Sequence, residues 1–269
     1  KNKNFFFKKI DIAKKNQLNR FFKRIKIDLI INLAGQAGVR YSIKNPRKYF
    51  DSNIVGFFNL IELARNKKIK HFISASSSSV YGENKMLPFK EDHNVNNIIQ
   101  FYAATKRSNE IIGQVYSRIY NMKFTFLRFF TVYGPWARPD MSLGYFVLNI
   151  IKEKKINVFN MGKHKRDFTH VDDIAEGTIK AIFRKNKKKF EIYNLGSGKK
   201  IPLMKYIKIL EKKLGIKAKI SFKKLQPGDI KDTWSSIKKS KKELSYKPKI
   251  NIEQGIDNYI KWYKNYYKV

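Results

Sequence analysis

Short apolar runs recur along the chain and alternate with longer amphipathic stretches. The runs are rich in Ile, Phe and Val and do not alternate regularly with polar residues. This composition is typical of strands that are buried on both faces of a parallel sheet. The runs predict strands at residues 5–10, 29–33, 71–75, 125–130 and 192–195.

The stretches between these runs have helical periodicity. They predict helices at residues 17–26, 50–66 and 103–120. In the second of these helices the spacing of four apolar residues marks a buried stripe, formed by Ile54, Phe57, Phe58 and Ile61. Strand and helix in repeated succession indicate a doubly wound α/β fold.

The pattern changes after Gly134. Pro135 and Pro139 bracket a loop, and short helices and strands follow it. Helices are predicted at residues 143–153, 172–183, 204–214 and 252–267. We therefore expect residues 1–134 to form the sheet. We expect residues 135–269 to form a mostly substrate-binding region, with some segments that return to the sheet.

Composition limits the class of protein. The chain has 269 residues, of which 42% are hydrophobic, and this is enough for a globular core. The absence of cysteine excludes disulfide frameworks and fits a reducing compartment, so we expect a cytoplasmic protein. The four histidines are scattered, which argues against a metal site. The apolar runs are far shorter than the ~20 residues that span a bilayer, which argues against membrane insertion.

The formal net charge of +37 raises the question of a nucleic-acid partner, because clustered Lys and Arg release counterions from phosphate backbones. Here the lysines are spread through almost every segment of the chain. This distribution is typical of solvated faces. We therefore expect no nucleic-acid partner, although a field of this sign attracts a small anionic substrate.

Tyr102 and Lys106 are the first candidates for chemistry. They lie four residues apart at the start of a predicted helix, and this spacing places them on one face. A phenol has a reference pKa of about 10, but an ammonium group nearby stabilises the phenolate and lowers that pKa. Tyr102 is therefore a candidate general base and acid.

A run of serines directly follows the predicted strand at residues 71–75. It occupies residues 76–79 and leads into Val80-Tyr81-Gly82. Small hydroxyl residues at the carboxyl end of a parallel strand lie where such sheets bind ligands. A serine at this place can hydrogen-bond a sugar hydroxyl and share its proton with Tyr102.

Together these motifs resemble the extended short-chain dehydrogenase/reductase family of NAD-dependent sugar-nucleotide epimerases and dehydratases. Further stretches that agree with this family are residues 127–135, 166–173, 193–196, 226–229 and 243–248. The resemblance covers essentially the whole chain. It implies NAD as cofactor, a partial NAD-binding Rossmann domain in residues 1–134, a UDP-sugar substrate and a homodimer.

The residue before Val80 bears on the type of reaction. Members of the family that dehydrate or decarboxylate typically carry an acidic residue immediately before the Val-Tyr-Gly. This chain has Ser79 at that position, with Ser78 before it. The resemblance therefore favours simple epimerisation over the loss of water or carbon dioxide.

Two stretches are similar to the group of the family that acts on UDP-glucuronate. They are residues 34–42 and 134–141, and each supplies an arginine. Guanidinium can meet a sugar carboxylate with two parallel hydrogen bonds, so Arg138 is the first candidate for this contact and Arg40 the second. Ala137 stands where the group usually has glycine. The resemblance then implies conversion of UDP-glucuronate to UDP-galacturonate.

The resemblance also implies roles at the reacting carbon. Ser77 would hydrogen-bond the sugar 4-hydroxyl, with Ser78 and Ser79 assisting. Tyr102 would take the proton of that hydroxyl while hydride leaves C4 for NAD, and hydride would later return to the opposite face. Lys106 would hold the nicotinamide ribose and tune Tyr102.

Other residues are implied in cofactor and substrate binding. Asn53 would pack near the nicotinamide, Ala34 and Ala75 would line the path of the cofactor, and the pair Asp11 and Ile12 would contact adenine. On the substrate side the resemblance implies three more contacts. Arg166 would meet the diphosphate, Asp229 the uridine ribose, and Thr131 the phosphate or the base.

One motif of the family is missing. The chain has no G-x-G-x-x-G, whose glycines let the backbone approach the pyrophosphate at a helix N-terminus. Because a βαβ unit takes about 30 residues or more, we expect the chain to begin roughly 50 residues late, at the third strand. In the order 3-2-1-4-5-6 this would leave the strand at 29–33 as an exposed hydrophobic edge. We expect these residues by themselves neither to hold NAD tightly nor to turn over.

Three alternatives remain open. A 4-epimerase of a neutral UDP-sugar would carry the same catalytic residues but would not depend on Arg138. An inactive truncated fragment would keep the scaffold without turnover. A basic nucleic-acid binder would be retained on DNA in a salt-sensitive manner and would ignore uridine nucleotides.

Overall fold

The structure is a computed structural model that describes residues 3–185, 187–226 and 228–269. Pro227, part of one of the motifs above, lies outside the described residues. The chain forms two compact units, and each combines several segments of the sequence. The first comprises residues 1–80, 98–126 and 187–191, and the second comprises residues 81–97, 127–186 and 192–269.

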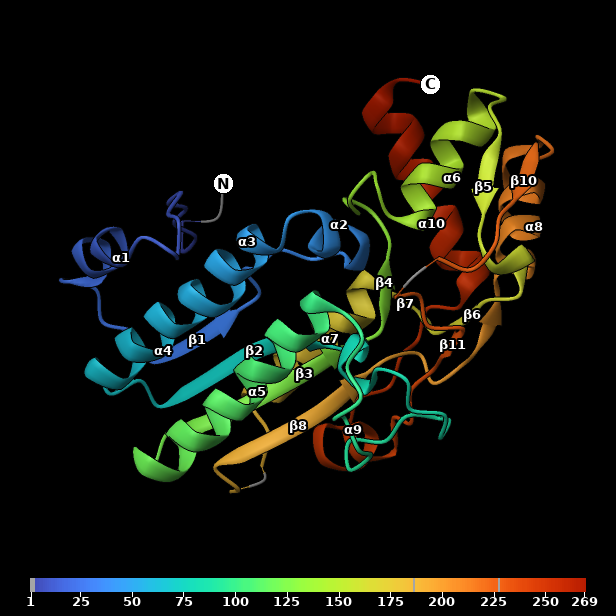
Figure 1. The fold of residues 1–269 in the computed structure, drawn as a ribbon. Coiled ribbons are helices and arrows are strands. Elements are labelled where there is room, and N and C mark those ends of the chain that lie inside the picture. The colour runs from blue at the N-terminus through green and yellow to red at the C-terminus, as the bar shows by residue number, and fades with distance from the viewer. Residues whose placement is uncertain (1–2, 186, 227) are drawn as a thin grey trace. The chain divides into compact units, whose positions relative to one another are not determined.

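A four-stranded sheet has the order β1 (Leu29–Asn32), β2 (His71–Ser77), β3 (Lys123–Phe129) and β8 (Phe190–Leu195) (Figure 1). β1 and β2 run parallel, and their last paired residues are Asn32 and Ser74. Every residue of β2 is buried, as expected for a strand covered on both faces. These strands confirm four of the five that the apolar runs predict.

The predicted strand at residues 5–10 is wrong. Residues 5–10 lie outside every strand, and Phe5, Phe6 and Phe7 are 74%, 75% and 73% exposed. Aromatic composition favours a strand, but a strand also needs a neighbour for its backbone hydrogen bonds. β1 ends the order of the sheet, and Leu33, directly after it, is 57% exposed.

The first unit also contains several helices, as Figure 1 shows. They are α1 (Lys15–Phe22), α2 (Val39–Lys44), α3 (Pro46–Tyr49), the π-helix η1 (Phe50–Val55), α4 (Gly56–Asn66) and α5 (Phe101–Ile119). Phe57 of α4 meets Phe72 of β2 at a ring distance of 5.8 Å. Gly113 brings α5 close to β3, because a side chain there would come within 2.5 Å of Phe126.

The predicted stripe on α4 is only partly correct. Phe57 and Ile61 are buried, whereas Phe58 is 47% exposed. Phe58 follows Phe57 directly, so it is turned by about 100° around the helix axis and leaves the buried face.

The second unit has helices and short strands of its own. The helices are α6 (Ser142–Ile151), α7 (Val171–Ile182), α8 (Leu203–Leu214), α9 (Lys238–Leu244) and α10 (Ile252–Tyr267). α8 ends at Leu214, as the sequence predicts, and Gly215 after it has the left-handed conformation, at φ 71°. The core combines aliphatic and aromatic side chains, and in it Phe168 stacks on Tyr206 at 4.3 Å.

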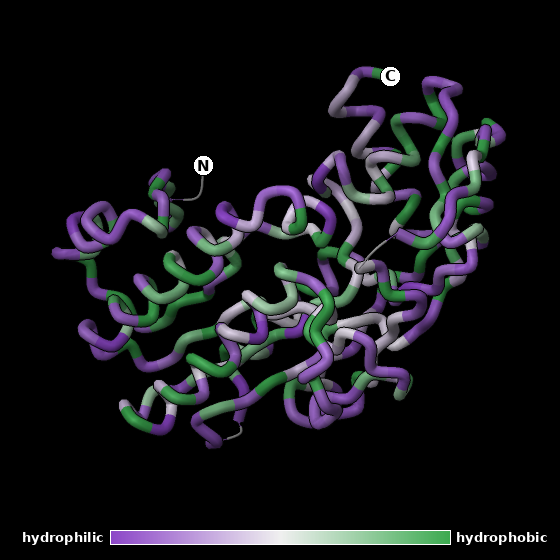
Figure 2. Tube along the Cα trace, viewed as in Figure 1, coloured by the Kyte–Doolittle hydropathy of each residue, from purple (hydrophilic) through white to green (hydrophobic). Residues whose placement is uncertain are grey.

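Three small sheets complete the second unit. One pairs β4 (Thr131–Tyr133) with β7 (Phe168–His170), and another pairs β5 (Ile156–Val158) with β10 (Ile220–Phe222). The third has the order β11 (Asp232–Thr233), β6 (Lys165–Arg166) and β9 (Ile201–Pro202). Figure 2 shows hydrophobic residues concentrated in the sheet strands and in α4 and α6, whereas α1 is mostly hydrophilic. Among the described residues, no helix combines the length and the apolar character that crossing a membrane requires.

Candidate functional site

The carboxyl ends of β1 and β2 form the centre of the candidate site in the first unit. Asn32 and Ser74 face each other in the parallel register, so Ala34 and Ala75 follow at the same edge of the sheet. The backbone N–H of Ala34 donates to Oδ1 of Asn32 at 3.2 Å and turns the chain. Ala34 is exposed and Ala75 is buried, so the edge is open on the β1 side.

Lys106 reaches this edge from α5. Its Nζ donates to the carbonyl oxygen of Ala75 at 3.0 Å, and the residue is only 5% exposed. Burial lowers the pKa of Lys106 to about 8, because the charged form loses its water. The structure therefore brings two predicted cofactor residues into direct contact.

Asn53 completes this group from the π-helix η1. Its Nδ2 donates to the carbonyl of Gln36 and to the hydroxyl of Thr105, both at 3.0 Å, and its Oδ1 accepts from the N–H of Gln36 at 2.7 Å. Gly35 packs closely against Asn53, since a Cβ there would be 2.8 Å from Oδ1 of Asn53. The same Cβ would be 3.6 Å from Nζ of Lys106. Short π-helices are frequent at functional sites. We describe this group, Ala34, Asn53, Ala75 and Lys106, as the sheet-end cluster.

Tyr102 is held in the first turn of α5. Its N–H donates to Oγ of Ser42 at 3.3 Å, and its carbonyl accepts from Thr105 Oγ1 at 2.7 Å. Its ring lies edge-on to Tyr49 at 6.1 Å. Tyr102 is half-buried, and the same helix turn that anchors it carries Lys106.

The serine run begins inside β2, which extends two residues beyond the predicted end. Ser77 is buried, and its hydroxyl donates to Oγ of Ser79 and accepts from the N–H of Ser79, both at 3.2 Å. Ser78 and Ser79 are half-buried and open a 3₁₀ turn. Ser77, Ser78 and Ser79 thus place three hydroxyl groups on one short segment at the carboxyl end of β2.

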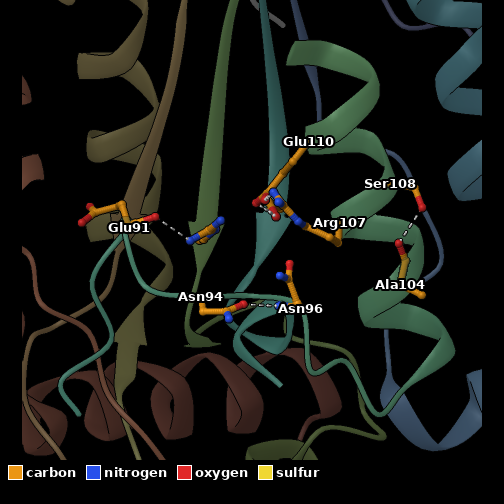
Figure 3. A network of polar contacts seen from close by, with 9 residues as sticks. Glu91, Asn94, Asn96, Ala104, Arg107, Ser108 and Glu110 are labelled. Carbon is orange, nitrogen blue, oxygen red and sulfur yellow. Dashed lines mark hydrogen bonds and ion pairs between the residues drawn. The ribbon is translucent and has the colours of Figure 1, made fainter. Parts of the chain in front are cut away.

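An ion pair with a buried carboxylate, next to this segment, was missed by sequence reasoning. Glu110 of α5 is fully buried, accepts from Oγ of Ser76 at 2.7 Å and pairs with Nη1 of Arg107 at 3.1 Å (Figure 3). Ser76 lies between Ala75 and Ser77, so the bond joins α5 to the strand that carries the serines. The available signal was the spacing from Lys106 to Glu110, which places both on one face of α5.

The predicted adenine contacts lie on another part of the first unit. Asp11 is exposed and its carboxylate accepts from the N–H of Ala13 at 2.9 Å. The carbonyl of Ile12 accepts from Asn59 of α4 at 3.0 Å, and the side chain of Ile12 packs against Gly56. Arg40, the second carboxylate candidate, is exposed in the first turn of α2.

Arg138, in the second unit, lies in the loop before α6. Its Nε donates to Oδ1 of Asp140 at 3.0 Å, and its Nη2 donates to Oδ2 of the same carboxylate. This hydrogen bonding lowers the pKa of Asp140 below its usual value. The guanidinium therefore already has a two-point carboxylate partner.

Arg166 and Asp229 are brought near each other in the second unit. Nη2 of Arg166 donates to the carbonyl of Ile230 at 2.6 Å, next to Asp229, and contacts Nδ1 of His164 at 3.3 Å. Burial and the charge of Arg166 together lower the pKa of His164. Thr131 lies in β4 and its N–H donates to the carbonyl of Asp167 at 3.0 Å.

Asp167 is a second buried carboxylate that sequence reasoning left without a role. Its oxygens accept from the N–H and Oγ of Ser197, the N–H of Gly198, the N–H and Oγ of Ser235, and Oγ1 of Thr169, at 2.6 to 3.1 Å. Asp167 is fully buried between Arg166 and the strand β7. It therefore ties the segment of Arg166 to two distant loops.

Comparison with known proteins gives a consistent result. Residues 1–196 match the model of the NAD dependent epimerase/dehydratase family. Protein CapI of Staphylococcus aureus is 41% identical over 98% of this chain and 84% of its own length. A UDP-glucuronate 4-epimerase of Thermodesulfobacterium geofontis is 42% identical over 98% of this chain and 81% of its own length.

Solved structures share the fold. The UDP-glucuronic acid 4-epimerase of Bacillus cereus, in complex with UDP-glucuronic acid and NAD, has a TM-score of 0.91 and 33% identity. The match covers 99% of this chain and 83% of the Bacillus cereus chain. The UDP-glucose 4-epimerase of Thermotoga maritima, with UDP-glucose, has a TM-score of 0.92 and 26% identity, with coverage of 99% and 87%.

Proposed function

Because this chain belongs to the NAD dependent epimerase/dehydratase family, we propose that it interconverts C4 epimers of a nucleotide sugar, with UDP-glucuronate as substrate and UDP-galacturonate as product. One observation carries the reaction type. Lys106 of α5 hydrogen-bonds Ala75, which lies two residues before Ser77 in β2, and the same helix carries Tyr102. The relatives that bind or act on UDP-glucuronate support the choice of sugar.

The residues of the sheet-end cluster fit the nicotinamide half of NAD. Gly35 leaves no room for a side chain against Asn53, so only backbone lies there, and residues 34–37 are exposed. Lys106 and Asn53 would hold the ribose and the nicotinamide side, with Ala34 and Ala75 along the path. Asp11 and Ile12 would contact the adenine. When bound, NAD supplies reversible hydride acceptance.

The side chains of this chain handle the proton. Tyr102 takes the proton of the sugar 4-hydroxyl and returns it after the sugar has turned over. The lowered pKa of Lys106, about 8, means that its ammonium group is charged below that pH. The charge then supports the phenolate of Tyr102. Ser77 orients the hydroxyl, with Ser78 and Ser79 beside it. Ser79 is not acidic, which favours epimerisation over elimination.

The remaining candidate residues are proposed for contacts to the rest of the substrate. Arg138 would bind the glucuronyl carboxylate, with Arg40 as the second candidate. Arg166 would bind the diphosphate, Asp229 the uridine ribose, and Thr131 the phosphate or base. The spread of the lysines supports a protein that acts on a small anionic substrate, without a nucleic-acid partner. The absence of cysteine fits the cytoplasm.

We also propose a homodimer through the outer faces of α4 and α5. Ile111, Val115 and Ile119 recur every four residues on α5 and are 46%, 45% and 67% exposed, and Phe58 of α4 is 47% exposed. A contiguous apolar face of this kind marks an interface. Val115→Glu should therefore convert dimer to monomer in analytical ultracentrifugation, whereas Lys70→Glu, at an exposed position after the end of α4, should not.

Nucleotide-sugar binding is the first test, because it does not require the phosphate loop that the sequence lacks. Calorimetry should show tighter binding of UDP-glucuronate than of UDP-glucose, and Arg138→Ala should remove the difference. Turnover with added NAD is followed by NMR, with Tyr102→Phe as the inactive control. Equal binding of both sugars, unaffected by Arg138→Ala, would overturn the acid-sugar assignment.

A neutral UDP-sugar is the second candidate substrate. The pairing of Arg138 with Asp140 favours it, because this arginine then needs no charged partner from the substrate. In that case UDP-glucose would bind at least as tightly as UDP-glucuronate. The calorimetric comparison therefore decides between the two candidates.

A further inference from the structure

Arg138 already binds a carboxylate within its own loop. Nε and Nη2 of Arg138 donate to the two carboxylate oxygens of Asp140. This side-by-side arrangement is the one in which guanidinium binds any carboxylate, including that of a sugar acid. Both partners reach solvent, with side chains 42% and 64% exposed.

The backbone of the loop holds Asp140 beside Arg138. The N–H of Met141 donates to the carbonyl of Arg138 at 3.1 Å and closes a tight turn around the pair. Gly144 of α6 lies against the residue between them, since a Cβ there would come within 3.0 Å of the backbone of Pro139. The two charged side chains therefore meet without a large loss of loop entropy.

Aromatic residues of α10 support the same loop from the other end. The ring of Trp136 lies 5.3 Å from that of Trp262 and 5.1 Å from that of Tyr266. Trp136 adopts a left-handed backbone conformation, at φ 63°, which a non-glycine residue rarely keeps without such support. The segment that presents Arg138 is thus fixed at both ends while its ion pair stays open to solvent.

We propose that Asp140 is a specificity-determining residue that competes with the substrate carboxylate for Arg138. The inference rests on the proposed function. With no acid sugar bound, Asp140 occupies the two donors of Arg138, and the carboxylate of UDP-glucuronate takes its place. A neutral sugar leaves the pair intact. Asp140 therefore lowers the preference of the site for acid over neutral sugars.

The strength of the pair sets the size of the effect. An exposed ion pair contributes about 0.2–1 kcal/mol, which corresponds to at most about a fivefold change in affinity. Asp140→Asn keeps the shape of the side chain and removes its charge. We expect this variant to bind UDP-glucuronate roughly two- to fivefold more tightly, with UDP-glucose binding unchanged.

The experiment measures both sugars by calorimetry on the wild-type chain, Asp140→Asn and a charge-matched control. Glu153→Gln is that control, because Glu153 is also exposed, lies in the same unit and pairs with Lys219 at 3.2 Å. It removes the same charge without touching Arg138. A second variant, Asp140→Ser, shows whether the result depends on the remaining amide.

A larger gain for UDP-glucuronate in both Asp140 variants than in the control supports the inference. Weaker UDP-glucuronate binding in these variants would overturn it, because Asp140 would then position Arg138 instead of competing for it. An equal gain for both sugars would overturn it as well. If the wild-type chain shows no preference that depends on Arg138, the proposed acid-sugar function fails, and the inference fails with it.

Discussion

The candidate residues of the two units are held in different ways. In the first unit Lys106, Asn53 and Ser77 are buried, and their polar atoms are hydrogen-bonded to backbone or to neighbouring side chains. In the second unit Arg138 is exposed and pairs with Asp140, two residues further along the chain. Groups that move protons need fixed positions and low dielectric, whereas groups that select a substrate must exchange one partner for another.

Each unit nevertheless contains one fully buried carboxylate that fixes the segment behind its candidate residues. Glu110 joins α5 to the serine-bearing strand, and Asp167 joins the Arg166 segment to two loops. The two anchors differ in their partners. Glu110 has an arginine beside it, whereas Asp167 is surrounded by hydroxyl and backbone N–H donors. Removal of Asp167 therefore leaves several buried donors without an acceptor.

Asp167→Ala should have the largest effect on stability. Loss of a buried charge that satisfies several donors costs about 3–5 kcal/mol, so we expect a markedly lower urea midpoint. Asp172→Ala is the matched control, because Asp172 lies in the same segment with its side chain 73% exposed. Equal midpoints for the two variants would show that Asp167 is not an anchor of the second unit.

The buried Lys106 should make stability depend on pH. Its pKa is lowered from 10.5 to about 8, so between these values the unfolded chain binds more protons than the folded chain. The free energy of unfolding should therefore rise from pH 8 toward pH 10.5 by up to about 3 kcal/mol from this group.

Urea unfolding of Lys106→Met across this range isolates that contribution. The variant should lose the rise, while Lys70→Met, at an exposed position, should follow the wild-type profile. Parallel profiles for Lys106→Met and wild type would contradict the burial of a charged Lys106.

Much of the fold could be predicted because the core strands are continuous apolar runs. β2 and β3 are buried on both faces, and the sequence shows this directly. The failed strand at residues 5–10 has similar composition, but strand formation also depends on a neighbour that local sequence does not specify. Phe58 shows the same limit for helices, since a shift of one residue moves a side chain off the buried face.

The site could be predicted only where local motifs carry it. Tyr102 and Lys106 are four residues apart, so their shared face is visible in the sequence. Glu110 and Ser76 are 34 residues apart, and Asp167 and Ser235 are 68 apart, so only the fold brings them together. The partner of Arg138 was missed for a different reason. The sequence identifies Asp140 only as part of the motif at residues 134–141. Whether two side chains pair within a loop depends on the backbone turn between them, which the motif does not specify.

Arg138→Lys tests the exposed candidate residue of the second unit. Lysine keeps the charge but cannot make two parallel hydrogen bonds to one carboxylate, so UDP-glucuronate binding should weaken about tenfold. UDP-glucose binding should change little. Arg40→Lys is the matched variant, because Arg40 is the other candidate and is also exposed. If Arg40→Lys gives the larger loss, the carboxylate contact belongs to α2 in the first unit, and the proposed division between a buried catalytic region and an exposed selective loop no longer holds.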